Sequence, residues 1–151
     1  MKRVRIGKPQ YYLQMAKVAS LRSTCLRRCY GCVIINNDEV VATGYNGSPR
    51  GETNCSDTGI CERQCEEHNS GNYGNCKAVH AEQNAMLSAS RSEMIGATMY
   101  LAWFEYKEGM IPESIDDCEP CPICMRMMKN SGIVKVINNK GVVWERNGNN
   151  W

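Results

Sequence analysis

Two short motifs in the second half of the chain constrain its fold more than any other feature. Cys121 and Cys124 are three residues apart at the expected start of a helix, where such residues share one face and the helix N-terminus favours thiolates. His80 and Glu82 stand together at the expected start of another helix. Two thiolates and one imidazole are typical zinc ligands. The pattern predicts that His80, Cys121 and Cys124 bind one zinc ion, which would bring both helix starts together.

Three protein ligands indicate a catalytic zinc site, because the fourth position stays open for water. Zinc lowers the pKa of bound water from about 16 toward about 7, so that hydroxide becomes available near neutral pH. Glu82 is not needed as a ligand and is placed to take the proton of that water. The alternative is a non-catalytic, zinc-stabilised binding module, although a structural site gives no reason for a glutamate beside the metal ligand.

Apolar periodicity and turn residues predict a mixed α/β fold. Helices are expected over 10–22, 80–92 and 120–130, and strands over 32–36, 40–45, 98–104, 133–138 and 142–146. Only Asn139, Lys140 and Gly141 separate the last two strands, which predicts an antiparallel hairpin. The order of the elements gives a five-stranded mixed sheet covered by helices.

The length of 151 residues suits a single domain over 1–151, with a long loop at 46–76 and an acidic insertion at 105–119. No apolar stretch approaches the roughly 20 residues that a membrane span needs, and no apolar signal core follows the first residues. We therefore expect a cytoplasmic protein without membrane contact. Its ten cysteines would then be reduced thiols and metal ligands instead of disulfides.

The two metal-binding motifs also match a known signature. The segments HAE at 80–82 and PCPIC at 120–124 follow the order H-x-E…P-C-x-x-C of zinc deaminases. The sequence resembles the cytidine and deoxycytidylate deaminase family, and from about residue 10 to 137 it is most similar to the deoxycytidylate branch. The closer resemblance is carried by RSTC at 22–25, TGYNGSPRG at 43–51, NC at 54–55 and CKAVHAEQNA at 76–85. It implies a cytidine deaminase-like three-layer α-β-α sandwich.

The resemblance implies hydrolytic deamination of a cytosine nucleotide, with dCMP converted to dUMP and ammonia as the first expectation. Hydroxide would add to C4, and Glu82 would protonate N3 and then the departing amine. The acidic insertion and the short final hairpin depart from the branch, so a nucleoside, dCTP or tRNA adenosine are alternative substrates. Aromatic residues total only 7%, and acids outnumber bases beyond residue 50, so a nucleic-acid partner is not expected.

The resemblance also implies nucleotide contacts for the segment GYNGSPRG. Asn46 is the first candidate for contact with the substrate, followed by Tyr45, Gly47 and Arg50. In regulated members this segment lies near a triphosphate effector, so dCTP and dTTP are candidate effectors here. Members of the family assemble from several copies, which implies a homo-oligomer. The residues alone require no more than a tight Asn-Gly and Ser-Pro turn.

Seven of the ten cysteines lie between residues 25 and 76, and the resemblance implies a second, structural zinc ion that ties the first helix to the long loop. The ligands expected for it are Cys25, Cys55, Cys61 and Cys76. Cys65 and His68 are alternatives to Cys61 as the fourth ligand. A loop of this length with little apolar content needs such a clip, because closed four-ligand sites contribute directly to folding. The cysteines expected to be buried free thiols are Cys29, Cys32 and Cys118.

Overall fold

The computed structural model of the chain describes residues 1–67, 70–112 and 116–148. At its centre is a five-stranded mixed sheet in the order β2-β1-β3-β4-β5. β3 and β4 are parallel, and the other neighbouring pairs are antiparallel, including the final β4–β5 hairpin. The predicted five-stranded mixed sheet is therefore confirmed. Its strands are β1 (Arg28–Asn36), β2 (Glu39–Tyr45), β3 (Thr98–Glu105), β4 (Lys135–Asn138) and β5 (Gly141–Glu145).

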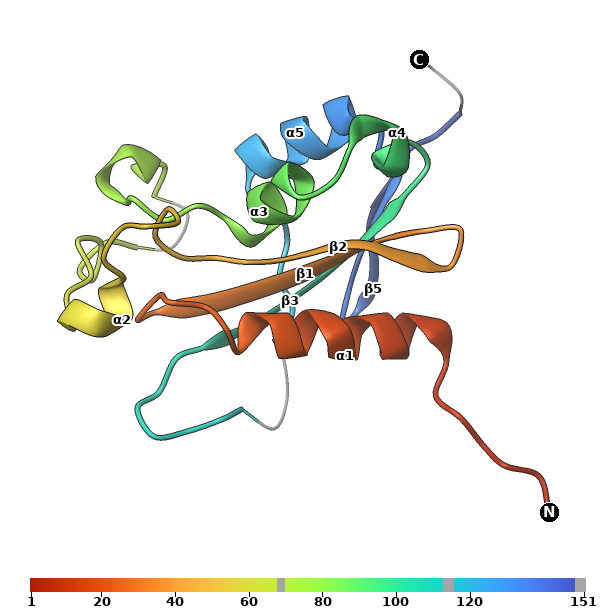
Figure 1. Cartoon of the computed structure of the whole chain (residues 1–151), viewed down its shortest axis with the longest axis horizontal. Coiled ribbons are helices and arrows are strands. Elements are labelled where there is room, and N and C mark those ends of the chain that lie inside the picture. The colour runs from red at the N-terminus through yellow and green to blue at the C-terminus, as the bar shows by residue number, and fades with distance from the viewer. Residues whose placement is uncertain (68–69, 113–115, 149–151) are drawn as a thin grey trace.

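Helices cover both faces of this sheet, which gives three layers (Figure 1). α1 (Lys8–Ser20) lies on one face and contacts β1, β3 and β2. α3 (Ala81–Leu87), α4 (Arg91–Met94) and α5 (Pro122–Ser131) lie on the other face. The three-layer α-β-α sandwich implied by the sequence is confirmed.

Alternating side chains of β1 contribute to both halves of the core. Cys32 and Ile34 belong to the apolar cluster beneath α3 and α5, whereas Val33 and Ile35 belong to the cluster beneath α1. All four are buried. A strand covered on both faces reads as a continuous apolar run, which explains the sequence CVII. The sheet thereby fixes α3 and α5, which carry the metal-binding motifs, on one side.

The position of α3 over the sheet depends on Gly44 in β2. A β-carbon at this position would lie 2.1 Å from the Ala81 carbonyl oxygen and 2.6 Å from the Ala85 backbone nitrogen. Only glycine lets the first turn of α3 approach the strand so closely. The helix start that carries His80 is therefore held by direct contact between two backbones.

The helix expected over 80–92 is divided in the structure. α3 ends at Leu87, and α4 begins after Ser90. The Ser90 side chain accepts a hydrogen bond from the Glu93 amide, and the Glu93 side chain accepts one from the Ser90 amide. Such a capping box starts a new helix and does not continue the previous one. The prediction of one continuous helix was wrong at this point.

Other boundaries also differ from the prediction: α1 begins and ends two residues earlier than expected, and β4 begins two residues later. β1 begins at Arg28 instead of residue 32, because Arg28 already pairs with Glu105 of β3. α5 begins at Pro122 instead of residue 120, because Cys121 has the extended backbone of an N-cap residue. The earlier start of β1 brings a further stretch of strand toward the loop end of the molecule.

The segment 46–76, expected to be a loop, contains two short helical pieces. These are α2 (Cys55–Thr58) and a 3-10 turn, Tyr73–Asn75. An isolated antiparallel bridge between Gly47 and Val79 closes the segment at its base. Figure 1 shows the segment at the end of the sheet where β1 begins. It therefore lies beside the start of α3 and can contribute to the same site.

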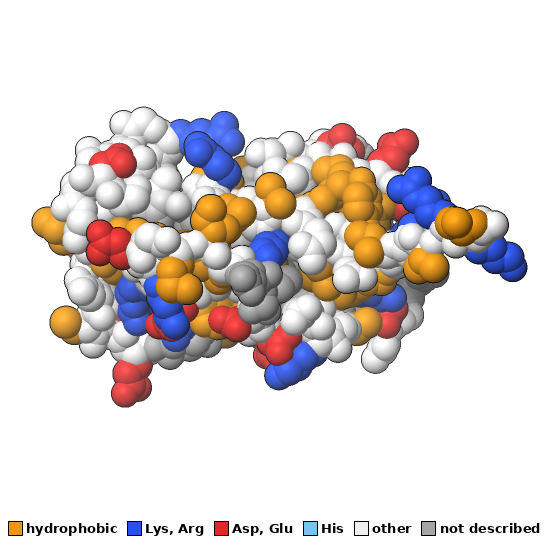
Figure 2. Space-filling model, turned by 90° about the horizontal axis from the view of Figure 1, so that it is seen from below, with side chains coloured by type: hydrophobic (Ala, Val, Ile, Leu, Met, Phe, Trp, Pro, Cys, Tyr) orange, Lys and Arg blue, Asp and Glu red, His pale blue; other side chains and the backbone are white. Residues whose placement is uncertain are grey.

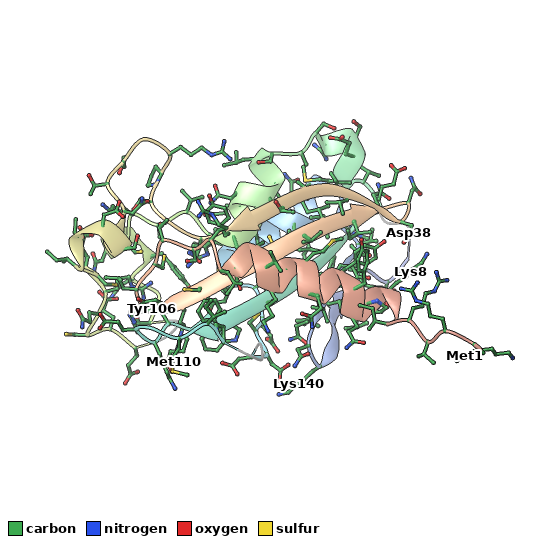
Figure 3. The ribbon with its side chains drawn as sticks, turned by 60° about the horizontal axis from the view of Figure 1, so that its bottom comes forward. Met1, Lys8, Asp38, Tyr106, Met110 and Lys140 are labelled. Atoms are coloured by element: carbon green, nitrogen blue, oxygen red, sulfur yellow. The ribbon has the colours of Figure 1, made fainter. Side chains whose placement is uncertain are left out.

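The acidic segment 105–119 returns to the sheet after it leaves β3. The Asp116 amide donates a hydrogen bond to the Trp103 carbonyl oxygen (2.9 Å), and the Trp103 indole donates to the Asp117 carbonyl oxygen (2.7 Å). Lys140, at the β4–β5 turn, pairs with the Asp117 carboxylate (3.2 Å). Figure 3 shows Tyr106 and Lys140 on the same side of the sheet. The insertion is therefore fastened to β3 at its returning end.

The face of the molecule around α1 carries mixed charges (Figure 2). Lys8 Nζ lies 2.6 Å from Asp38 Oδ2, which joins the start of α1 to the β1–β2 turn (Figure 3). Acidic, basic and apolar side chains are interspersed on this face, which differs from the broad basic surface typical of nucleic-acid binding. Within the described ranges, no helix is both long enough and apolar enough to cross a membrane.

Candidate active site

The metal-binding side chains stand at the starts of two helices. His80 is the N-cap of α3 and has extended backbone angles (φ −72°, ψ 154°). Its amide donates to the Gln83 side-chain oxygen (2.9 Å), which satisfies one of the free donors of the helix start. Cys121 is the N-cap of α5, with Pro122 at the first helical position, where its fixed φ suits a helix. Cys124 follows in the first turn, and its amide donates to the Cys121 sulfur (3.4 Å).

The structure brings these three side chains to metal-binding distance. His80 Nδ1 lies 3.5 Å from Cys121 Sγ and 3.4 Å from Cys124 Sγ, and all three ligand atoms lie within 4.8 Å of one another. In a tetrahedral zinc site with the usual bond lengths, nitrogen and sulfur ligands lie about 3.6 Å apart. The three side chains are therefore placed to hold a zinc ion. In the part of the chain that the structure describes, they are the only group of this kind.

The two thiols of the site ionise differently. The pKa of the Cys121 thiol is lowered, chiefly by a hydrogen bond with Cys124 and further by His80. The pKa of the Cys124 thiol is raised, chiefly by its hydrogen bond with Cys121 and then by burial. The pair therefore favours a thiolate at Cys121, and a bound cation would favour a second thiolate at Cys124. Zn²⁺ would supply that charge, and ligands of this type suit it.

Glu82 lies beside the ligands in the first turn of α3. It is only 4% exposed, and burial raises the pKa of its carboxyl group. The charges of His80 and Cys121 also act on this carboxyl group, which locates it at the metal site. A buried carboxyl group with a raised pKa can both accept and donate a proton near neutral pH. The geometry therefore supplies a proton carrier next to a metal-binding triad.

One cleft joins this site to aromatic side chains that the sequence analysis did not identify. The Tyr73 ring meets the His80 ring edge-on, with 5.6 Å between centroids. Tyr30 lines the same cleft and stacks on Trp103, with 5.7 Å between centroids and 19° between planes. Burial raises the pKa of Tyr30, so its hydroxyl stays protonated. Flat apolar walls beside a buried carboxyl group suit a planar heterocyclic ligand.

The four residues expected to contact the substrate are divided between two hollows. Asn46 is 8% exposed and lines the cleft that holds Glu82. Its side-chain oxygen accepts hydrogen bonds from the Ser23 hydroxyl (2.6 Å) and the Tyr30 amide (2.8 Å). The other three line a second hollow; they are Tyr45, Gly47 and Arg50. The structure therefore brings only Asn46 to the metal site.

Four cysteines expected to bind a structural metal line the active-site cleft on the side of segment 46–76. We call Cys25, Cys55, Cys61 and Cys76 the four-cysteine group. The charges of Cys55 and Cys76 act on the Cys25 thiol, whose pKa is raised to about 12 chiefly by burial, so these side chains are neighbours. Their sulfur atoms do not form a metal-ligand cluster among the described residues.

The remaining cysteines and the second histidine divide into three cases. Cys65 is exposed, while His68, the other alternative ligand, lies outside the described residues. Cys29, Cys32 and Cys118 are buried. Buried thiols of this kind behave as small apolar side chains.

Comparison with known proteins agrees with the geometry of the site. Residues 7–140 match the sequence model of the cytidine and deoxycytidylate deaminase zinc-binding region. The deoxycytidylate deaminase of Saccharomyces cerevisiae is 38% identical over 128 residues, which cover 84% of this chain and 36% of that protein. The enzyme of the same name from Schizosaccharomyces pombe is covered to 35%, so the chain spans about a third of the length of these two relatives.

A shorter relative and a solved structure match along most of their length. The deoxycytidylate deaminase of Mycobacterium phage D29 is 35% identical over 138 residues, covering 87% of this chain and 93% of that protein. The dCMP deaminase of cyanophage S-TIM5, solved in complex with dCMP and dUMP, superposes with a TM-score of 0.62 and 25% identity, covering 90% of this chain and 83% of that one. The match of the family model to most of the chain and the phage relative together show that the chain belongs to the cytidine and deoxycytidylate deaminase family.

Proposed function

We propose that this protein hydrolyses dCMP to dUMP and ammonia. The observation that carries the proposal is the buried Glu82 carboxyl group beside three side chains that already lie at zinc-binding distance. Two phage relatives support dCMP as the substrate: the D29 protein carries the name deoxycytidylate deaminase, and the S-TIM5 enzyme binds dCMP and dUMP.

Glu82 carries the protons of the proposed reaction. A zinc ion held by His80, Cys121 and Cys124 would supply a water molecule of lowered pKa. Glu82 accepts one proton as the water oxygen adds to C4 of the cytosine, and delivers it to N3. Glu82 then carries the second proton of the water to the amino group, so that the C–N bond breaks, ammonia leaves and uracil remains. The raised pKa of the carboxyl group suits this double role.

The cleft and the second hollow would bind different nucleotides. Asn46 would contact the substrate because it lines the cleft, after exchanging one of its internal hydrogen bonds. The second hollow contains Arg22 and Arg50, together with a buried Ser48 hydroxyl that has no hydrogen-bond partner among the described residues. Cationic and hydroxyl groups of this kind suit the phosphates of a dCTP or dTTP effector. Tyr45 and Gly47 would belong to this effector site.

The proposal includes a second, structural zinc ion bound by the four-cysteine group. Its support is that Cys25 and three thiols of segment 46–76 line the same cleft, with Cys55 and Cys76 close enough to act on Cys25. A closed thiolate site would fasten segment 46–76 to the end of α1. Reduced thiols suit a cytoplasmic location. Assembly into a homo-oligomer is part of the same proposal.

The test is the loss of pyrimidine absorbance with zinc-loaded protein and cytidine, deoxycytidine, dCMP or dCTP, with Glu82→Gln beside the wild type. We expect turnover of dCMP and a zinc-retaining but nearly inactive variant. If a nucleoside or dCTP were turned over instead of dCMP, that compound would be the substrate. Ammonia release from a stem-loop RNA alone would indicate tRNA adenosine. If the zinc-loaded protein turned over none of these substrates, a non-catalytic binding module would be favoured.

A further inference from the structure

Arg28 differs from the other arginines that line the active-site cleft. Arg27 donates hydrogen bonds to the carbonyl oxygens of Arg63 and Glu66, and Arg63 pairs with the Glu66 carboxylate (2.9 Å). Arg28 Nη1 is shielded from water and has no hydrogen-bond partner among the described residues. Leaving a buried charged donor without an acceptor is unfavourable. This arginine therefore has the capacity to bind an anion that the described residues do not supply.

Arg28 is held in place by aromatic contacts. Its guanidinium group lies over the Trp103 ring, 5.2 Å from the centroid, and Trp103 in turn stacks on Tyr30. The returning insertion fixes the same indole, because Trp103 Nε1 donates to the Asp117 carbonyl oxygen (2.7 Å). A guanidinium group stacked on an anchored ring loses little freedom when it binds a ligand. The acidic insertion therefore orients a cation, although its own charge is negative.

The location of Arg28 relative to Glu82 suits a nucleotide. Arg28 and Glu82 line the same cleft, and the charges of both act on the hydroxyl group of Tyr30, with opposite sign. Tyr30 is therefore a neighbour of both the proton carrier and Arg28. A cytosine base at Glu82 would leave its sugar and phosphate to run along Tyr30 toward Arg28. Glu119 also lines the cleft, so a phosphate group entering it needs a compensating cation.

We propose that Arg28, held over Trp103, binds the 5′-phosphate of the substrate and makes the enzyme prefer a nucleotide to a nucleoside. The inference rests on the proposed deaminase function and adds the residue that selects the phosphorylated substrate. Arginine suits this role because its planar group donates two parallel hydrogen bonds to phosphate oxygens.

The test compares Arg28→Gln with Arg91→Gln, a change of an exposed arginine on α4 outside the cleft. Arg28→Gln should raise the KM for dCMP about 10- to 100-fold, since hydrogen bonds to a charged group are worth about 1.5–3 kcal/mol. Its kcat for dCMP and its KM for deoxycytidine should change little. Arg91→Gln should match the wild type with both substrates. Trp103→Leu should raise the KM for dCMP by a smaller factor, because the cation remains but is less well oriented.

Binding of the product separates failure of this inference from failure of the proposed function. Calorimetry with dUMP and with deoxyuridine needs no turnover, and wild-type protein should bind dUMP more tightly, an advantage that Arg28→Gln loses. If the wild type turns over no dCMP but still binds dUMP more tightly than deoxyuridine, the proposed activity is wrong and the phosphate contact stands. If Arg28→Gln leaves both the KM for dCMP and dUMP binding unchanged, the inference is overturned. Should Arg28→Gln fail to fold, Arg28→Lys must weaken dUMP binding without affecting deoxyuridine, or the inference is likewise overturned.

Discussion

The two cysteine-bearing sides of the cleft hold their thiols in different ways. Cys121 and Cys124 stand on α5, opposite His80 on α3, and their ligand atoms already lie at zinc-binding distance. The four-cysteine group reaches the cleft from irregular segments and from α2, and forms no metal-ligand cluster among the described residues. Helix starts packed against a sheet can preorganise a metal site, whereas ligands on a loop rely on the ion to draw them together.

The largest effect is expected from removing a ligand of the preorganised triad. Cys121→Ser should abolish turnover and lower the zinc content by one ion per chain, because only two ligands of the triad remain. Metal analysis and the dCMP assay measure both quantities. Arg126→Ala changes an exposed residue of the same helix and should preserve both. If Cys121→Ser kept full activity, the triad would not be the catalytic centre.

The next effect separates chemistry from metal binding on the same side of the cleft. Glu82→Gln keeps the size of the side chain, but its amide cannot carry a proton. The kcat should therefore fall by about 10²- to 10⁴-fold. The zinc content should match the wild type, because Glu82 is not part of the ligand cluster. Turnover and bound metal are measured on one preparation. A variant that lost its zinc would instead make Glu82 part of the metal site.

A smaller effect on turnover is expected on the opposite side of the cleft. Cys55→Ser should remove the proposed second zinc ion and loosen segment 46–76, while the triad around Cys121 keeps its own ion. Limited proteolysis should then cut this segment faster, and kcat should fall less than in Glu82→Gln. Ser56→Ala, a change of the exposed neighbour, is the control. The second metal would be ruled out if the wild-type protein held one zinc ion per chain and Cys55→Ser were cut no faster than the wild type.

The features predicted correctly from the sequence are those with a local pattern. The spacing of Cys121 and Cys124 on one helix turn, with His80 before Glu82, indicates the metal triad without knowledge of the sheet. Runs such as CVII, together with a three-residue connection between the last strands, are sufficient to predict the strands and their final hairpin. The division of helix 80–92 was missed because the capping box at Ser90 lies inside an apolar pattern that continues across it.

The features that were missed depend on strand register and on distant contacts. Tyr45 and Asn46 are neighbours in the chain but line different hollows, because the Asn46 side chain turns inward to bond with Ser23 and Tyr30, whereas Tyr45 stays exposed. These bonds join residues 23 and 16 positions apart in the chain, so the local sequence does not indicate the separation. Arg28 and Trp103 meet because β1 pairs with the whole length of β3, from Arg28 opposite Glu105 to Ile35 opposite Thr98. No local spacing connects these two residues.

The smallest expected effect tests whether the two sides of the cleft differ in rigidity. A β-carbon at Gly44 would meet the Ala81 carbonyl oxygen at 2.1 Å, and one at Gly47 would meet the Thr24 hydroxyl oxygen at 2.2 Å. The first neighbour is helix backbone, whereas the second is a side chain that can rotate. Gly44→Ala should therefore lower the free energy of unfolding by about 1–3 kcal/mol, as overpacking does, and Gly47→Ala by less.

Denaturant unfolding of zinc-saturated protein measures this difference, with Gly74→Ala as the control, because nothing lies within 4 Å of a β-carbon there. Gly44→Ala should also weaken zinc binding by the triad, since α3 must shift and carries His80 with it. Gly47→Ala should regain stability when combined with Thr24→Ala, because the smaller side chain removes the clash. Equal losses in both single variants, with no recovery in the pair, would mean that the two sides are equally rigid. The position of the zinc ion would then be set by its ligand side chains alone and not by the rigidity of the packed helices.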